Sequence, residues 1–420
     1  MFSPRVPRQL DANAFARALG AARAAGRELI DLTISNPTRA GIVYPDALFA
    51  PLSSSSVAQY SPEPFGMLTA RQAVADDYAR RGVKTTSGRI VLTASTSEAY
   101  SLLFKLLCAP AGDSVLVPVP SYPLFEHLTR LDGVEAAAYS LRYDGRWWVD
   151  FESVDRMWDA RTRALLAVTP NNPTGSVLSA DEHEALAMRC AARDAAMIVD
   201  EVFADYPLEG SPGSRDPGAT KPNDGAPGSS AAAEASADSP EPWRRRLDPG
   251  GQPPCLTFRL GGLSKSAALP QLKLGWIAVD GPDNLVDAAL ARLELICDTY
   301  LSVSTPVQIA APHLITAGCA PRAQIARRVR ANYAALRGMC ADCSTVRVLN
   351  ADAGWSAVLR VAAKTGEEEM ALDLLERDGV VVYPGFFFDF PHEAFLVVSL
   401  LPDPRSFTAG VRAVLERVDG

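Results

Sequence analysis

The chain has 420 residues, of which 48% are hydrophobic, and this length predicts a large globular protein of two or three domains. Its net charge is −8, and its Lys and Arg residues are scattered rather than gathered in runs. This pattern excludes a basic face for nucleic acid. We expect no membrane span and no secretory signal, because no apolar stretch is long enough for either. Small molecules are the expected partners.

The cysteines and histidines show no ligand pattern. The seven cysteines are odd in number and have no framework spacing, which indicates a reducing compartment, the cytoplasm. Cys340 and Cys343 form a lone CxxC pair, and the four histidines lie far apart along the chain. We therefore predict no metal site.

The first three hundred residues predict an α/β fold. Residues 12–25 have helical spacing, and residues 28–34 predict a short strand that ends at the turn SNPT. Between about residues 89 and 279, helical patterns alternate with short apolar runs: RIVLT, SVLVPV, ALLAVT, AMIVD, LTFRL and LGWIAV. Strands separated by helices predict a mostly parallel sheet with helices on both faces.

Residues 208–254 interrupt this series with Gly, Pro, Ser, Ala and Asp, and they predict a disordered surface insertion. Long helices follow from residue 308 to 340, and then VRVL, WSAVLRV, VVVYPG and FLVVSLL predict a smaller α+β domain. We divide the chain into an N-terminal arm of that small domain (1–45), a large domain (46–304) and a C-terminal small domain (305–420).

Lys265 is the strongest single candidate for chemistry. It lies among small residues at the end of a predicted strand, in GGLSKSAALPQLKLGW. A lysine that forms an imine must be partly neutral, and burial or a second cation such as Lys273 lowers its pKa. Read alone, this stretch is equally typical of a surface lysine in a turn.

Three further motifs follow predicted strands. In VLTASTSEAY a helix starts after the hydroxyl cluster Ser95, Thr96 and Ser97, which is typical of a phosphate site or of simple N-capping. Asn172, in VTPNNPTG, projects an amide from a tight turn. Asp200 ends the apolar run MIVD, and a carboxylate in a buried position needs a cation. Each motif alone is also explained by a turn or a cap.

Together and in this order, the motifs resemble the class I/II aminotransferases, the fold-type I enzymes of pyridoxal 5'-phosphate (PLP), from about residue 31 to 418. The resemblance implies a seven-stranded-type sheet in the large domain. It also implies that Lys265 carries PLP as a Schiff base, that Asp200 holds the ring nitrogen and that Asn172 binds O3'. The phosphate would lie on Ser95, Thr96 and Ser97, and NPTG is intact at residues 172–175.

The resemblance extends to two tyrosines and to the reaction. It implies that Tyr122 stacks on the pyridine ring, and that Tyr60 reaches the phosphate of a neighbouring subunit in a homodimer with shared active sites. The reaction implied is the transfer of an amino group between an amino acid and a 2-oxo acid. Lys265 would then move a proton between the substrate α-carbon and the cofactor.

The sequence departs from the family at three positions. Phe203 replaces a tyrosine whose hydroxyl binds O3', and Lys273 replaces an arginine on the phosphate. Val397 stands where the family has the arginine that clamps the substrate α-carboxylate. Arg39 and Arg360 are candidate replacements for that clamp, or ordinary surface arginines. Trp355 and the cluster FFFDF at 386–390 predict an apolar pocket or a packed core.

Two alternatives share these motifs. A PLP-dependent lyase or cyclising synthase would use the same cofactor and the same lysine, and the loss of the arginine at Val397 keeps this alternative open. A PLP-binding regulatory domain is the other, but no basic helix-turn-helix pattern accompanies the motifs.

Overall fold

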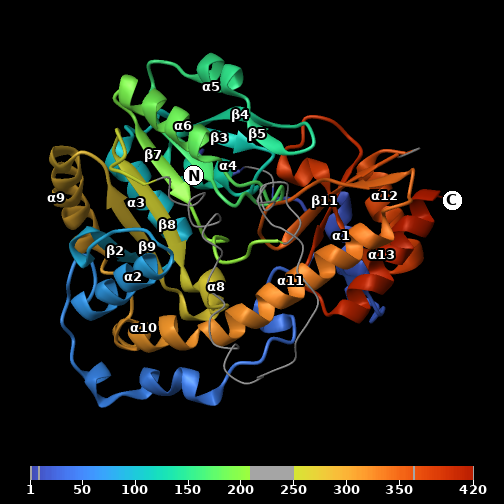
Figure 1. Cartoon of the computed structure of the whole chain (residues 1–420), viewed down its shortest axis with the longest axis horizontal. Helices are drawn as coiled ribbons and strands as arrows, with labels where there is room; N and C mark the ends of the chain where they lie inside the picture. The colour runs from blue at the N-terminus through green and yellow to red at the C-terminus, as the bar shows by residue number, and fades with distance from the viewer. Residues whose placement is uncertain (1, 8–9, 209–249, 363–364, 420) are drawn as a thin grey trace, which may run out of the picture.

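The computed structural model describes residues 2–7, 10–208, 250–362 and 365–419 (Figure 1). Most of the predicted insertion, residues 209–249, lies outside the described residues. Its two ends are described. Leu208 is 3% exposed, and its N–H donates to the carbonyl of Asp352, while the Gln252 side chain donates to the carbonyl of Gly281.

An eight-stranded sheet forms the centre of the larger part of the molecule. Its order is β2-β9-β8-β7-β6-β3-β4-β5. Strands β3, β4, β6, β7 and β8 pair in parallel, whereas β9 is antiparallel to β2 and β8, and β5 is antiparallel to β4. The predicted mostly parallel α/β fold is confirmed, with the short β5 added at one edge. The strands are β2 (Ile90–Thr93), β3 (Ser114–Val119), β4 (Glu135–Tyr143), β5 (Trp147–Val149), β6 (Thr162–Val168), β7 (Ala196–Asp200), β8 (Thr257–Gly262) and β9 (Gly275–Asp280).

Helices cover both faces of this sheet because its central strands are apolar on both sides. Along β6, Ala164 and Leu166 belong to one core, and Leu165 and Ala167 to the opposite one. One face carries α3 (Thr96–Leu107), α4 (Phe125–Asp132) and α9 (Asp283–Tyr300). The other carries α5 (Phe151–Met157) and α6 (Ala180–Ala192), with α2 (Leu68–Arg80) and α10 (Thr305–Ala317) over the β2 and β9 end.

A four-stranded antiparallel sheet, ordered β10-β11-β14-β13, lies in the C-terminal part of the chain (Figure 1). Residues of the N-terminal segment, among them Phe15 and Leu32, share its hydrophobic core. The boundaries at residues 45 and 304 stay a prediction. The elements are α1 (Ala14–Ala24), β1 (Ile30–Asp31), α11 (Cys319–Met339), β10 (Val346–Val348), β11 (Ser356–Val361), α12 (Glu367–Asp373), β12 (Val380–Val381), β13 (Tyr383–Pro384), β14 (Phe395–Ser399) and α13 (Pro404–Asp419).

Short helical turns connect these elements. One of them, α8 (Leu263–Ser266), follows β8 directly and contains Lys265. The others are η1 (Pro37–Arg39), η2 (Asp46–Ser53), η3 (Ser55–Ala58), η4 (Ser87–Arg89), η6 (Pro270–Leu272), η7 (Leu374–Asp378) and η8 (Gly385–Phe388).

A tight seam joins the turn after β6 to the loop before β11. Gly175 has φ +67°, and its carbonyl accepts the N–H groups of Asp352 and Ala353. A Cβ atom at Gly175 would lie 2.6 Å from both the Ala351 Cβ and the Ala353 carbonyl oxygen. Only glycine therefore fits at this point of the seam.

Replacing Gly175 tests the importance of this seam. We expect Gly175→Ala to lower the free energy of unfolding by about 1–3 kcal/mol, because it adds backbone strain and a clash with the neighbouring backbone. Chemical denaturation measures the change. Gly20→Ala is the control, because Gly20 lies exposed in α1 with open space around it, and we expect it to stabilise the protein by about 0.5–1 kcal/mol. Equal stability of the two variants would contradict the claim that only glycine fits at this point of the seam.

Candidate active site

A cavity of about 880 Å³ lies at the carboxyl edge of the parallel strands, and residues of both sheets line it. Side chains that follow neighbouring parallel strands meet at this edge, which is where open α/β sheets bind ligands. The cavity brings together most of the predicted site residues: Ser95, Thr96, Ser97, Tyr122, Asn172, Asp200, Lys265, Lys273 and Trp355.

Aromatic side chains lie close to Lys265 in this cavity. Its Nζ atom lies 4.9 Å from the ring centroid of Trp355 and 5.5 Å from that of Phe203. The Tyr206 hydroxyl donates to the Lys265 carbonyl and fixes the backbone. Burial lowers the pKa of Lys265 to about 8, although the charge of Asp200 acts in the opposite direction. The neutral, nucleophilic amine is therefore far more populated near neutral pH than that of an ordinary lysine.

Asp200 lies at the end of β7 and is 7% exposed. Its Oδ2 atom accepts the Tyr100 hydroxyl at 2.7 Å, and its Oδ1 atom accepts the Val202 N–H at 3.1 Å. Burial raises the pKa of Asp200, while the bond from Tyr100 opposes this rise. A cation bound beside Asp200 would favour its ionised form.

The turn after β6 positions Asn172. The neighbouring Asn171 is 2% exposed, accepts the Ser121 hydroxyl at 2.7 Å and donates to the Pro120 carbonyl at 2.9 Å. These bonds tie the turns after β3 and β6 together. Ser356 donates to Oδ1 of Asn172 at 3.2 Å, so the NH₂ group of Asn172 is the donor left for a ligand.

Tyr122 follows β3 and presents its ring at the cavity, in a T-shaped contact with Phe125 at 6.1 Å. It is 41% exposed. A flat ring in this position offers one face for stacking against a planar ligand.

The start of α3 lies against the start of β9 and forms an anion cradle there. Ser95 caps the helix by accepting the Glu98 N–H at 3.1 Å. A Cβ atom at Gly275 would lie 3.0 Å from the Ser95 carbonyl carbon and 3.1 Å from the Thr96 nitrogen, so glycine permits this close approach. Lys273 brings a positive charge to the same cavity. Helix N–H groups, hydroxyls and a lysine suit a phosphate.

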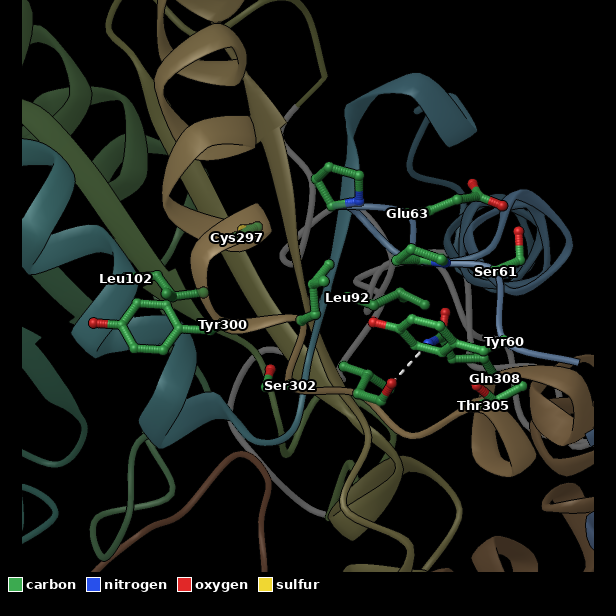
Figure 2. Close-up of a pocket in the computed structure, with 15 residues that line it drawn as sticks. Tyr60, Ser61, Glu63, Leu92, Leu102, Cys297, Tyr300, Ser302, Thr305 and Gln308 are labelled. Carbon is green, nitrogen blue, oxygen red and sulfur yellow. Dashed lines mark hydrogen bonds between the residues drawn. The ribbon is translucent and has the colours of Figure 1, made fainter.

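Three predicted residues lie elsewhere. Tyr60 is 73% exposed and lines a separate hollow, to which Gln308 and Tyr300 also contribute (Figure 2). Arg39 and Arg360 are both exposed, and neither is among the described residues that line the cavity. The structure therefore gives no support to these two arginines as a carboxylate clamp.

The sequence reasoning missed Tyr100 and Ser264. Tyr100 lies one turn into α3, on the helix face that is also typical of core packing, and nothing in the sequence links it to Asp200. Ser264 lines the cavity beside Lys265. A hydroxyl residue directly before the candidate lysine is the signal that could have drawn attention to it.

Within the described parts of the chain, no group of three His, Cys, Asp or Glu residues could hold a metal ion. Among the helices of these same parts, none is both long and apolar enough to cross a membrane.

Known proteins resemble this chain in sequence and in fold. The glutamate-pyruvate aminotransferase AlaA of Haemophilus influenzae is 26% identical over 285 residues, which are 67% of this chain and 62% of that protein. The S-alkyl-thiohydroximate lyase of Arabidopsis thaliana is 28% identical over 274 residues, 64% of this chain and 52% of that protein. The match thus spans less than two thirds of either relative.

The structure of alanine aminotransferase from Pyrococcus furiosus has a TM-score of 0.82 and 19% sequence identity, with 100% of both chains covered, which shows a shared fold. The model of the family described as aminotransferase class I and II matches residues 27–405. Because this match covers most of the sequence, the chain belongs to the class I and II aminotransferases.

Proposed function

We propose that the chain is a PLP-dependent aminotransferase, with Lys265 as the residue that carries the cofactor. The observation that carries this proposal is the cavity that brings a lysine of lowered pKa, a buried carboxylate, an amide donor and an anion cradle together. The names of the relatives and the family resemblance suggest an amino acid and a 2-oxo acid as the substrate pair.

The residues present fit PLP at each of its polar groups. The hydroxyls of Ser95, Thr96, Ser97 and Ser264 and the charge of Lys273 would hold the phosphate. The NH₂ group of Asn172 would donate to O3', and the ring of Tyr122 would pack on the pyridine face. Asp200, whose pKa is raised by burial, would gain a positive partner in the ring nitrogen.

When bound, PLP supplies an aldehyde that takes up the substrate amine and a ring that withdraws electrons from the adjacent carbon. The Nζ atom of Lys265 would hold the cofactor, and once freed by the substrate amine it would act as the base that takes a proton from the substrate carbon and gives it back as an acid. Tyr100 and Val202 hold the Asp200 carboxylate in place during this exchange.

A homodimer with shared active sites is part of this proposal. Tyr60 is exposed and lies outside the cavity of its own chain, as expected of a residue that contacts the active site of a neighbouring subunit.

The seven cysteines are free thiols, which supports a reducing compartment, the cytoplasm.

The cofactor assignment is tested with Lys265→Ala. We expect the wild-type protein to form a Schiff base with PLP, visible by absorbance and fixed to the chain by borohydride, and the variant to form none. Lys84→Ala is the control, because Lys84 is exposed and does not line the cavity. Labelling of the Lys265→Ala chain at wild-type yield would overturn the assignment.

Amino donors then separate transamination from elimination. We expect a donor to convert the bound cofactor to its pyridoxamine form, with one carbonyl product for each active site. Release of ammonia without that conversion would instead identify a lyase.

The pKa of Lys265 gives a pH dependence. Its value of about 8 lies below that of an ordinary lysine, so the amine loses its proton as the pH rises through 8. We expect the rate at which the PLP-free protein captures PLP to increase through this range and to level off above it, as measured by stopped-flow absorbance. A rate that climbs steadily past pH 10 would show an unshifted lysine.

Tyr100→Phe tests the support of Asp200. The variant removes the donor to Oδ2, which raises the pKa of Asp200 further and weakens its hold on a protonated ring nitrogen. We expect PLP affinity, measured by absorbance titration, to fall about tenfold. Tyr139→Phe is the matched control, since Tyr139 is a buried tyrosine that donates to the Leu166 carbonyl. Equal PLP affinities of the two variants would show that the Tyr100 hydroxyl does not contribute to PLP binding.

A further inference from the structure

A group of buried charges lies between the end of α2 and the strands β7 and β8. It consists of three carboxylates and three guanidinium groups, which we call the ion layer: Asp77, Arg80, Arg81, Glu201, Asp205 and Arg259. Apart from Arg80, each of these side chains is at most 8% exposed within the single chain. The ion layer therefore does not depend on a neighbouring subunit.

Glu201 connects the ion layer to the candidate active site, because it directly follows Asp200. Asp200 faces α3, where it accepts the Tyr100 hydroxyl. Successive residues of a strand point to opposite faces, so the Glu201 side chain lies behind Asp200. Nη1 of Arg259 donates to Oε1 of Glu201 at 2.7 Å, and Nη1 of Arg81 lies 3.6 Å from Oε2.

Two carboxylates this close in a buried place oppose each other's ionisation. Burial raises the pKa of Asp200, and the negative charge of Glu201 raises it further. Arginines beside Glu201 offset its charge, and the offset is large because the dielectric is low there. A protonated Asp200 would be a poor partner for a cationic ring nitrogen, so the balance of charge at Glu201 affects the site.

Other titratable groups face Asp200 and Glu201. Those around Asp200 are Tyr100 of α3, Tyr122 after β3 and Lys265 of α8. On the Glu201 side, α2 also contributes Asp77, which Nε of Arg80 contacts at 2.9 Å, and Tyr78, whose ring lies 4.3 Å from Cζ of Arg81. None of these groups is altered in the variants below.

The ion layer also holds backbone. Nη2 of Arg80 contacts Oδ1 of Asp205 at 2.8 Å, and the next residue, Tyr206, donates its hydroxyl to the Lys265 carbonyl. A purely structural role is therefore the competing explanation, and the test has to exclude it.

We propose that Glu201 and Arg259 are positioning residues whose ion pair controls how readily Asp200 gives up its proton, and so keeps Asp200 ionised toward the ring nitrogen of PLP. This inference rests on the proposed function, and it adds to that function a pair of residues that act through Asp200 without touching the cofactor.

The test is the pH dependence of PLP affinity, measured by absorbance titration. Below the pKa of Asp200, binding of PLP with a protonated ring nitrogen must release a proton, so the affinity declines toward acid pH. We expect Glu201→Gln, which removes a negative charge, to move the midpoint of this decline about one pH unit lower, and Arg259→Met, which removes a positive charge, to move it about one pH unit higher. The double variant Glu201→Gln/Arg259→Met should lie between the two.

The opposite directions separate charge from structure. A purely structural role would weaken PLP binding in both single variants and leave the midpoint in place, and that result would overturn the inference. Arg259→Lys keeps the charge, so we expect it to keep the wild-type midpoint, and together with Glu201→Gln it decides the matter if Arg259→Met does not fold. Asp150→Asn is the matched control, since Asp150 is a buried carboxylate that Arg142 contacts at 2.6 Å and it does not line the cavity.

A measurement without cofactor separates this inference from the proposed function. The PLP-free full-length protein, labelled with ¹³C at the aspartate carboxyl groups, is titrated by NMR, and Asp200→Asn identifies the Asp200 signal. We expect a lower pKa of Asp200 in Glu201→Gln than in the wild type. If PLP does not bind the wild type, the proposed function fails while this titration still decides the inference, and an equal pKa in the two proteins would refute it.

Discussion

The parallel register of three strands is the constraint on which the site depends. Val168 of β6 lies opposite Asp200 of β7, and Asp200 lies opposite Leu260 of β8. The turn with Asn172 and the short helix with Lys265 begin a few residues beyond these points, so both reach the same edge of the sheet. A slip of one residue would turn Asp200 to the opposite face. Such a slip would also exchange the side chains that β7 contributes to the two cores, Ile198 on one face and Met197 and Val199 on the other, and would disrupt the close packing of both.

Strand ends were therefore the part of the site that the sequence could predict. Apolar runs that end in Asp200 or in the NPTG turn are visible in the sequence, and their parallel pairing follows from the helices between them. Tyr100 could not be found in this way, because its bond to Asp200 depends on how α3 packs against the sheet. Charge is the only feature of Arg39 and Arg360 that points to a carboxylate, and charge does not reveal that both residues are exposed and outside the cavity lining.

The departures from the family pattern gather around the candidate lysine. Phe203 and Trp355 enclose Nζ of Lys265 in aromatic surface, and Val397 extends the apolar lining on β14. Compared with the family pattern, Phe203 lacks a hydroxyl and Val397 lacks a guanidinium. Both differences remove a polar group from the cavity and increase the desolvation of an amine placed there. The same surface thus lowers the pKa of the lysine and makes this side of the cavity apolar.

The seam at Gly175 has a mechanical consequence. Its carbonyl holds the loop before β11, and Ser356 at the start of β11 holds Asn172, so the Asn172 amide moves together with β11 of the four-stranded sheet. We expect any rotation of the four-stranded sheet to turn about this seam rather than to open it. The distance between Asn172 and Trp355 would then stay constant, while the side of the cavity lined by α4 and η8 would widen or narrow.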